Sequence, residues 1–257
     1  MKQKPISLSS LSYEIRNITG NPFVHIFGIA LPIFLTILIS KAATSDMNDP
    51  SAISLASTSI FLGIGFIIPM ATILMGYSCT YSQEVEKGIA LRMTLFGFNQ
   101  KYVMINRLIA EFIFMTIAFL IYATAGYIVL DLKLPTVSGA LIYLLCLYAY
   151  SAIMFLLAHS IAGMIGKFGL TYAVTMSLYF AMMIFGGSMG ITYDKMPEAM
   201  QAVARLLPNN YITQDAYTIW IGDSYRFVPM IQSYVFLAAI AGILLFLSVY
   251  RSKRKIH

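Results

Sequence analysis

Charge is scarce in this chain. Asp, Glu, Lys and Arg together make up 11% of its 257 residues, whereas a soluble domain carries about 25%. Hydrophobic residues make up 59%. Such a chain has too few polar side chains to cover a water-exposed surface, so soluble folds are excluded and an integral membrane protein is predicted.

Two further scarcities argue against whole classes of chemistry. The two cysteines, Cys79 and Cys146, lie in or beside apolar runs, and the three histidines are scattered. No disulfide framework, metal centre or His-based triad is therefore indicated. The phosphate-binding loop G-x-x-x-x-G-K-[ST] is also absent, because the nearest match, residues 163–167, lacks the spacing and the final Ser or Thr. We expect no catalytic residues, metal or cofactor in this chain.

Long apolar runs dominate what is present. A helix needs about 20 apolar residues to cross a hydrocarbon core of about 30 Å. The runs predict an all-α integral membrane protein that forms a single domain over residues 1–257. Its six transmembrane helices are expected at about 23–40, 55–77, 108–130, 137–164, 170–186 and 228–250.

Three amphipathic segments lie outside these runs. Residues 1–20 place Leu8, Leu11, Ile15 and Ile18 on one helical face, which predicts a helix in the lipid headgroup layer. Residues 187–227 carry two helical stripes and predict short helices before the last span. The stripes are Met196, Met200, Val203, Ala204 and Leu207, and then Ile212, Ala216, Ile219 and Trp220.

The third segment, residues 82–107, is rich in charge between two apolar runs. A helical spacing of apolar residues runs through Glu84 to Phe96 and predicts one amphipathic helix. Gly97 is expected to end it, and Asn99 to cap the helix that follows. A solvated loop is the alternative. The spaced apolar residues are Val85, Ile89, Met93 and Phe96.

The basic residues predict the orientation. If both termini lie on one side of the membrane, that side receives most Lys and Arg, and the positive-inside rule makes it the cytoplasm. We therefore expect residues 82–107 inside the cell and 187–227 outside, in a plasma membrane rather than on nucleic acid. The inner set is Lys2, Lys4, Arg16, Lys87, Arg92, Lys101, Arg107, Lys167, Arg251, Lys253, Arg254 and Lys255, against Lys41, Lys133, Lys195, Arg205 and Arg226 outside.

A few polar or aromatic residues inside the spans are functional candidates. Glu111 is the acidic residue placed within a span, where a carboxylate is costly, and Arg107 one turn before it offers an ion pair. His159 fits a hydrogen bond between helices better than a proton carrier. Aromatic and Met-rich surfaces suit either a path for an apolar substrate or ordinary packing. The residues that could line such a path are Tyr77, Tyr179, Phe180 and Met183.

Two stretches resemble the permease subunits of ABC-2 type transporters. Residues 84–92, EVEKGIALR, are similar to the acidic segment, glycine and amphipathic turn that precede the third span of those permeases, although Val85 and Ile89 depart from the usual order. Residues 207–211, LPNNY, after the Met196–Pro197 helix, resemble the pattern ahead of their last span. With six spans, the amphipathic start and the basic tail, the likeness covers essentially the whole chain.

The resemblance implies a subunit of an ATP-driven exporter in a bacterial cell membrane. It would pair with a second permease copy, identical or homologous, and with cytoplasmic ATPase subunits that hold ATP and Mg²⁺. Its cargo would be a drug, an antimicrobial peptide or a lipid-like compound. The segment that docks on the ATPase would be the coupling helix, with Glu84, Glu86, Lys87, Gly88, Leu91, Arg92 and Phe96 as its residues.

Three other functions stay open at this point, and a membrane scaffold or immunity protein that transports nothing is one of them. A flippase for a lipid-linked glycan belongs to the same family and would need a wider polar groove. A secondary transporter or channel without an ATPase would need several intramembrane ionisable residues and often an internal repeat, of which the sequence shows one carboxylate and no convincing repeat.

Overall fold

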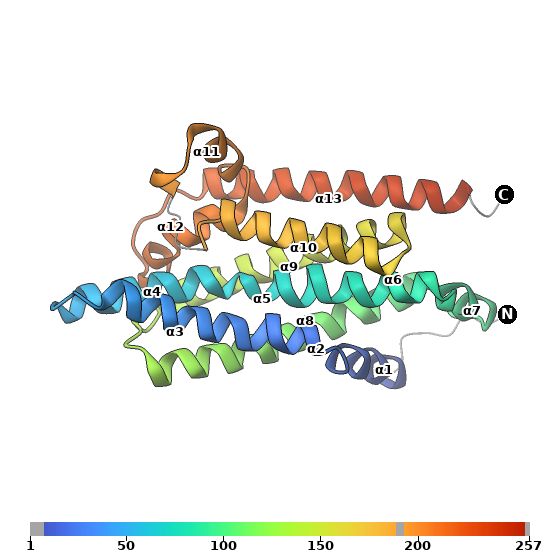
Figure 1. Ribbon diagram of the computed structural model, residues 1–257, viewed down its shortest axis with the longest axis horizontal. Coiled ribbons are helices and arrows are strands. Elements are labelled where there is room, and N and C mark those ends of the chain that lie inside the picture. The colour runs from blue at the N-terminus through green and yellow to red at the C-terminus, as the bar shows by residue number, and fades with distance from the viewer. Residues whose placement is uncertain (1–7, 189–192, 255–257) are drawn as a thin grey trace.

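Long helices run side by side along the longest axis of the molecule (Figure 1). The structure is a computed structural model that describes residues 8–188 and 193–254. Within these residues, six helical stretches are long and apolar enough to cross a membrane, which confirms the six predicted spans. They are Pro22–Thr44, Pro50–Glu86, Lys101–Val129, Val137–Ile165, Phe168–Phe185 and Val228–Arg251.

The first two spans are not uniform α-helices, because each contains a π-helical segment. Glycine lets the two spans approach closely here: a Cβ on Gly28 would lie 2.5 Å from Cγ2 of Thr72, and one on Gly76 would lie 2.6 Å from Cγ2 of Val24. The first span consists of α2 (Pro22–His25), η1 (Ile26–Ala30) and α3 (Leu31–Thr44), and the second of α4 (Pro50–Gly65), α5 (Ile67–Pro69), η2 (Met70–Tyr77) and α6 (Ser78–Glu86).

The second span forms the centre of the bundle. In its most apolar window 89% of the residues are buried, against 50% or less in the other spans. Hydroxyl groups of neighbouring helices bond to its backbone near the break at Phe66: Tyr122 donates to the Phe61 carbonyl at 2.7 Å and Tyr143 to the Leu62 carbonyl at 2.8 Å. These bonds satisfy carbonyl groups where the helix is irregular.

The remaining spans are α8 (Gln100–Val129), α9 (Val137–Ile165), α10 (Phe168–Phe185) and α13 (Val228–Arg254). Local signals define their ends. The side chain of Asn99 accepts from the Lys101 N–H at 2.9 Å and caps α8, as predicted. Gly166, with φ of 64°, ends α9 in the left-handed conformation that glycine adopts readily.

The segment before the last span forms η3 (Tyr193–Lys195), α11 (Glu198–Ala204) and α12 (Pro208–Ile221). α12 packs against α4 and α9. The predicted apolar stripe is its buried face, since Ile212, Ala216, Ile219 and Trp220 are all buried. The second stripe therefore packs against protein and closes one end of the bundle.

The N-terminal helix α1 (Leu8–Thr19) packs against α8. Of its predicted apolar face, Ile18 is buried and Leu11 and Ile15 pack against the core, whereas Leu8 is 86% exposed. Most of this face thus contacts protein. A position in the headgroup layer stays a prediction.

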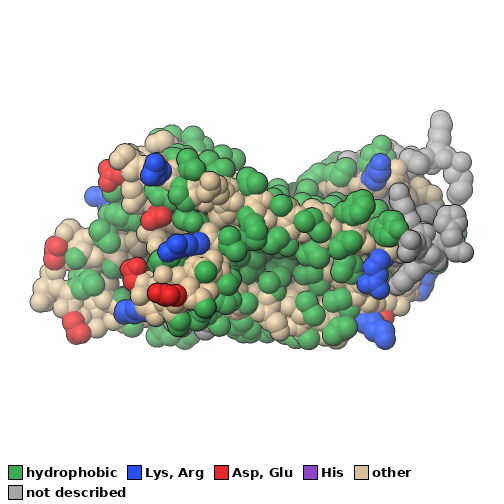
Figure 2. All heavy atoms as spheres, turned by 90° about the horizontal axis from the view of Figure 1, so that it is seen from above, with side chains coloured by type: hydrophobic (Ala, Val, Ile, Leu, Met, Phe, Trp, Pro, Cys, Tyr) green, Lys and Arg blue, Asp and Glu red, His purple; other side chains and the backbone are tan. Residues whose placement is uncertain are grey.

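We call the two ends of the bundle the α7 end and the α11 end. α7 (Ile89–Leu95), α1 and the last turn of α13 lie at the first, and α11 lies at the second (Figure 1). On the face shown in Figure 2, the middle is largely hydrophobic and charged side chains gather toward the two ends, with the acidic ones mainly at the α11 end. This distribution is typical of a protein that spans a membrane.

Candidate functional site

The charged segment between the second and third spans forms a sharp corner. α6 ends at Glu86, Gly88 adopts a φ of 66°, and α7 begins at Ile89. The prediction of one continuous helix from Glu84 to Phe96 is therefore wrong. Gly88 tolerates the left-handed turn, and the Arg92 side chain bonds back to the Lys87 carbonyl at 2.8 Å. The spacing of the apolar residues does not reveal this break, because the same spacing continues on both sides of Gly88.

The tip of the corner exposes large apolar side chains. Leu91, Leu95 and Phe96 are 66%, 70% and 71% exposed. They lie in or beside a helix of seven residues that Gly88 and Gly97 bound on its two sides, each with positive φ. We call these three residues the α7 tip. Such exposed apolar groups on a short, turn-bounded element are typical of a contact surface.

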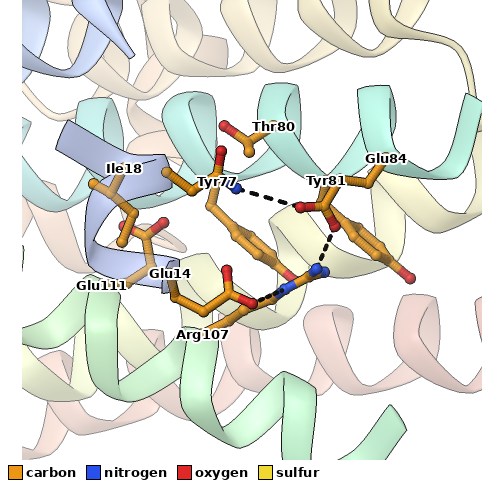
Figure 3. Close-up of a pocket in the computed structure, with 9 residues that line it drawn as sticks. Glu14, Ile18, Tyr77, Thr80, Tyr81, Glu84, Arg107 and Glu111 are labelled. Atoms are coloured by element: carbon orange, nitrogen blue, oxygen red, sulfur yellow. Dashed lines mark hydrogen bonds and ion pairs between the residues drawn. The ribbon is translucent and has the colours of Figure 1, made fainter. Parts of the chain in front are cut away.

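A buried arginine joins three helices on either side of the corner in the sequence (Figure 3). Nε of Arg107 on α8 donates to Oε1 of Glu14 on α1 at 3.2 Å, and its Nη2 donates to Glu84 on α6. Asn17 on α1 adds a bond from Nδ2 to Oε1 of Glu84 at 3.3 Å. We call Glu14, Asn17, Glu84 and Arg107 the ionic cluster. Removing one member of a buried pair is strongly destabilising, so the cluster determines how α1, α6 and α8 dock together.

Glu84 is buried in the structure. The resemblance implies that it belongs to the segment that docks on the ATPase, and that role stays a prediction. Glu84 is 5% exposed and points inward to Arg107. Glu86 is the carboxylate that stays at the surface, where its Oε2 accepts from the Phe168 N–H at 2.9 Å and ties the corner to α10.

Glu111 does not form the predicted pair with Arg107. The ion pairs of Arg107 in the described part of the chain go to Glu14 and Glu84. Glu111 is 2% exposed, and its Oε2 has no hydrogen-bond partner among the described residues. It lines a cavity of about 10 Å³ together with the ionic cluster, close to the smallest space that holds one water molecule.

Aromatic rings form one wall beside the cluster. The Tyr77 hydroxyl lies 2.8 Å from Nδ1 of His159, a hydrogen bond between helices as expected for this histidine. The ring of Tyr81 stacks on His159 with centroids 4.6 Å apart, and the Arg107 guanidinium lies 5.2 Å from the Tyr81 centroid. A cation above a ring is favourable where water is excluded.

The other suggested path residues do not join this site. Tyr179 and Met183 are buried in the core, and Phe180 is 40% exposed. Only Tyr77 of that set lines the cavity. The structure therefore does not bring the four side chains to one passage, and their role in translocation stays untested.

The sequence-based candidates did not include Glu14, Asn17 or Tyr81, and of these three Glu14 carries the charge that pairs with Arg107. A signal was present, because Glu14 lies three residues after Leu11 and four before Ile18, on the apolar face of its helix. Burial raises the pKa of the Glu14 carboxyl, an effect that Arg107 opposes. A carboxylate on an apolar helical face indicates a buried partner.

The model of the ABC-2 type transporter family matches residues 8–221. The chain belongs to this family. The match runs from α1 through α12 and includes every residue of the ionic cluster and the α7 tip. No curated protein and no solved structure matches the chain. With its six apolar helices, this ABC-2 permease is a multi-pass membrane protein and a transport subunit.

Proposed function

We propose that this ABC-2 permease is the membrane subunit of an ATP-driven exporter and that the α7 tip docks on a separate ATPase subunit. The observation that carries the proposal is the α7 tip, an exposed apolar element connected to the spans by a buried ionic cluster. A partner that moves the tip would displace Glu84, and with it Arg107 and Glu14. The displacement would therefore be transmitted to α6, α8 and α1 together.

Each part of the corner has a role in the proposed coupling between the ATPase and the spans. The three apolar side chains of the tip enter a cleft of the ATPase, which binds ATP and Mg²⁺ itself. Gly88 and Gly97 allow the tip to tilt against the spans, and Glu86 holds the corner on the first turn of α10. Two states of the bundle, in a dimer of permease chains, would open and close the route for cargo.

The charge distribution supports placing the α7 end in the cytoplasm of a bacterial cell. Lys87, Arg92, Lys101 and Lys167 lie in or beside the connections at this end. The positive-inside rule then places α11 and α12 outside. The mainly apolar character of the spans favours a hydrophobic or amphipathic cargo over a large polar glycan.

The docking step is tested by charging the α7 tip. Leu95→Glu places a carboxylate in an apolar contact, so we expect ATPase binding by the purified permease to fall about tenfold or more. The measurement is co-purification with the ATPase subunit, followed by cargo-dependent ATP hydrolysis. Leu134→Glu is the matched control, because Leu134 is equally exposed, at 74%, in the connection at the α11 end.

Unchanged binding and hydrolysis in Leu95→Glu would contradict the docking role of α7. Flux of cargo through proteoliposomes that contain only the permease, with no ATPase, would contradict the ATP-driven mechanism and favour a secondary transporter.

A further inference from the structure

A second cavity at the α7 end is separate from the α7 tip. It measures about 340 Å³ and is bounded by the α1–α2 connection, α6 and the start of α10. Its largest apolar surfaces come from Phe23 and Phe168. Its polar lining consists of Arg16, Asn17, Asn21, Thr80 and Gln83. The cavity therefore combines one cation, neutral hydrogen-bonding groups and aromatic rings.

The cavity lies where three membrane spans end. Each of its three walls includes the end of a membrane span: Pro22 begins the first, Gln83 lies in the last turn of the second, and Phe168 begins the fifth. Span ends meet the headgroup layer of a bilayer. A lipid at the protein surface would present its phosphate to this cavity.

The charge of the cavity lacks a counter-ion. Arg16 is exposed and has no ion-pair partner among the residues that the structure describes. The two nearby carboxylates are occupied, since Glu84 pairs with Arg107 and Glu86 accepts from the Phe168 N–H. An anion in the cavity would meet a free guanidinium, the group best suited to bind phosphate oxygens in a bidentate manner.

The apolar part of the cavity suits the rest of a lipid molecule. Phe23 lies against Tyr172 with ring centroids 5.7 Å apart, and Phe168 stacks on the same ring at 6.1 Å. This cluster joins α2 to α10 beside the polar groups. Aromatic side chains at the membrane interface favour contact with both the headgroup and the first part of the acyl chains.

We propose that the cavity between α1, α6 and α10 binds the phosphate group of an anionic membrane lipid through Arg16, with Asn17, Thr80 and Gln83 as hydrogen-bonding partners. Asn17 and Thr80 also line the small cavity of the ionic cluster. A lipid bound here would contact Asn17, whose Nδ2 donates to Oε1 of Glu84. The lipid would thereby stabilise the docking of α1 on α6.

The test measures lipid retention by the purified full chain, without any ATPase, so it does not depend on the proposed transport function. The probes are phosphatidylglycerol and phosphatidylcholine, counted per chain by native mass spectrometry. We expect preferential retention of phosphatidylglycerol, a loss of about tenfold in Arg16→Gln and partial recovery in Arg16→Lys, which restores the charge but not the bidentate geometry. Lys101→Gln is the matched control, because it removes one exposed positive charge at the same end and should retain the lipid.

Three results would overturn the proposal. The first is equal retention of the two lipids by the unaltered chain. The second is full retention of phosphatidylglycerol by Arg16→Gln, or an equal loss in Lys101→Gln. The third is displacement of the lipid by inorganic phosphate at comparable concentration, which would identify a site for free phosphate instead of a lipid headgroup.

Discussion

At the α7 end the helices are joined through charged side chains, whereas at the α11 end they are joined through neutral bonds to the backbone. Arg107 bridges Glu14 and Glu84 at the first. At the second, Nε1 of Trp220 donates to the Lys133 carbonyl at 2.8 Å, and the Trp220 carbonyl accepts from the Thr136 N–H at 2.9 Å.

This difference indicates which end is able to move. Long charged side chains can exchange partners while their helices shift, and each ion remains compensated as long as one partner stays within reach. Helices joined by hydrogen bonds to the backbone and by close backbone contacts cannot shift in this way without breaking those bonds and contacts. We therefore expect rearrangement at the α7 end and a nearly fixed α11 end during transport.

Loss of the central cation should have the largest effect on stability. Arg107→Met leaves Glu14 and Glu84 without their shared partner, and we expect the free energy of unfolding in mixed micelles to fall by about 3–5 kcal/mol. The control combines Arg107→Met with Glu14→Gln and Glu84→Gln, which removes all three charges. This triple variant should recover most of the lost free energy of unfolding. If it were as unstable as Arg107→Met, unpaired charge would not be the cause of the loss.

A backbone contact at the α11 end should give the next largest effect. A Cβ on Gly139 would lie 2.4 Å from the Trp220 carbonyl oxygen, and a backbone atom cannot rotate away. Gly139→Ala is expected to cost about 1–3 kcal/mol in the same unfolding measurement. Gly242→Ala has no neighbouring atom within 4 Å and should be neutral or slightly stabilising; a similar loss there would contradict the steric explanation.

The single hydrogen bond of the Trp220 indole should matter less. Trp220→Phe keeps an aromatic ring and removes the donor to Lys133, so we expect a loss of about 1 kcal/mol in the free energy of unfolding. Tyr217→Phe, which removes a hydroxyl on the same helix, provides the comparison. If neither variant changed the free energy of unfolding, the neutral hydrogen bond of Trp220 would not be what stabilises the packing at the α11 end.

The smallest expected effect is the pH dependence of stability that Glu14 contributes at the α7 end. Burial raises the pKa of Glu14 above its ordinary value of 4.5, so the folded protein keeps this proton to a higher pH than the unfolded chain. The resulting stabilisation is full below the ordinary pKa and is lost as the pH rises through the folded-state pKa. Thermal unfolding of the unaltered chain should become less favourable to the folded state as the pH rises, and Glu14→Gln should reduce this slope; an identical slope in both would contradict the assignment.

Local rules predicted much of the fold. The length of the apolar runs predicted six spans, because the hydrocarbon core demands a minimum helical length whatever the tertiary arrangement. Asn99 caps α8, and Ile212 and Trp220 lie on the buried face of α12, because capping and helical periodicity act over a few residues.

The candidate site was less predictable. Spacing predicted a continuous helix where Gly88 turns the chain, since the apolar pattern continues across the break. The burial of Glu84 was not predicted either, because nothing in the local sequence shows that Arg107 lies beside it. Periodicity describes which residues share a face but does not show what that face contacts.

The sequence by itself therefore determined that this protein crosses the membrane six times and carries a charged connection between its second and third spans. Both properties depend on short-range hydropathy and on the cost of placing charge in lipid. Only the tertiary structure decided which carboxylates Arg107 binds. Glu111 is its neighbour along the helix, yet the packing of α1 and α6 against α8 brings Glu14 and Glu84 within bonding distance, and an ion pair depends on distance in space.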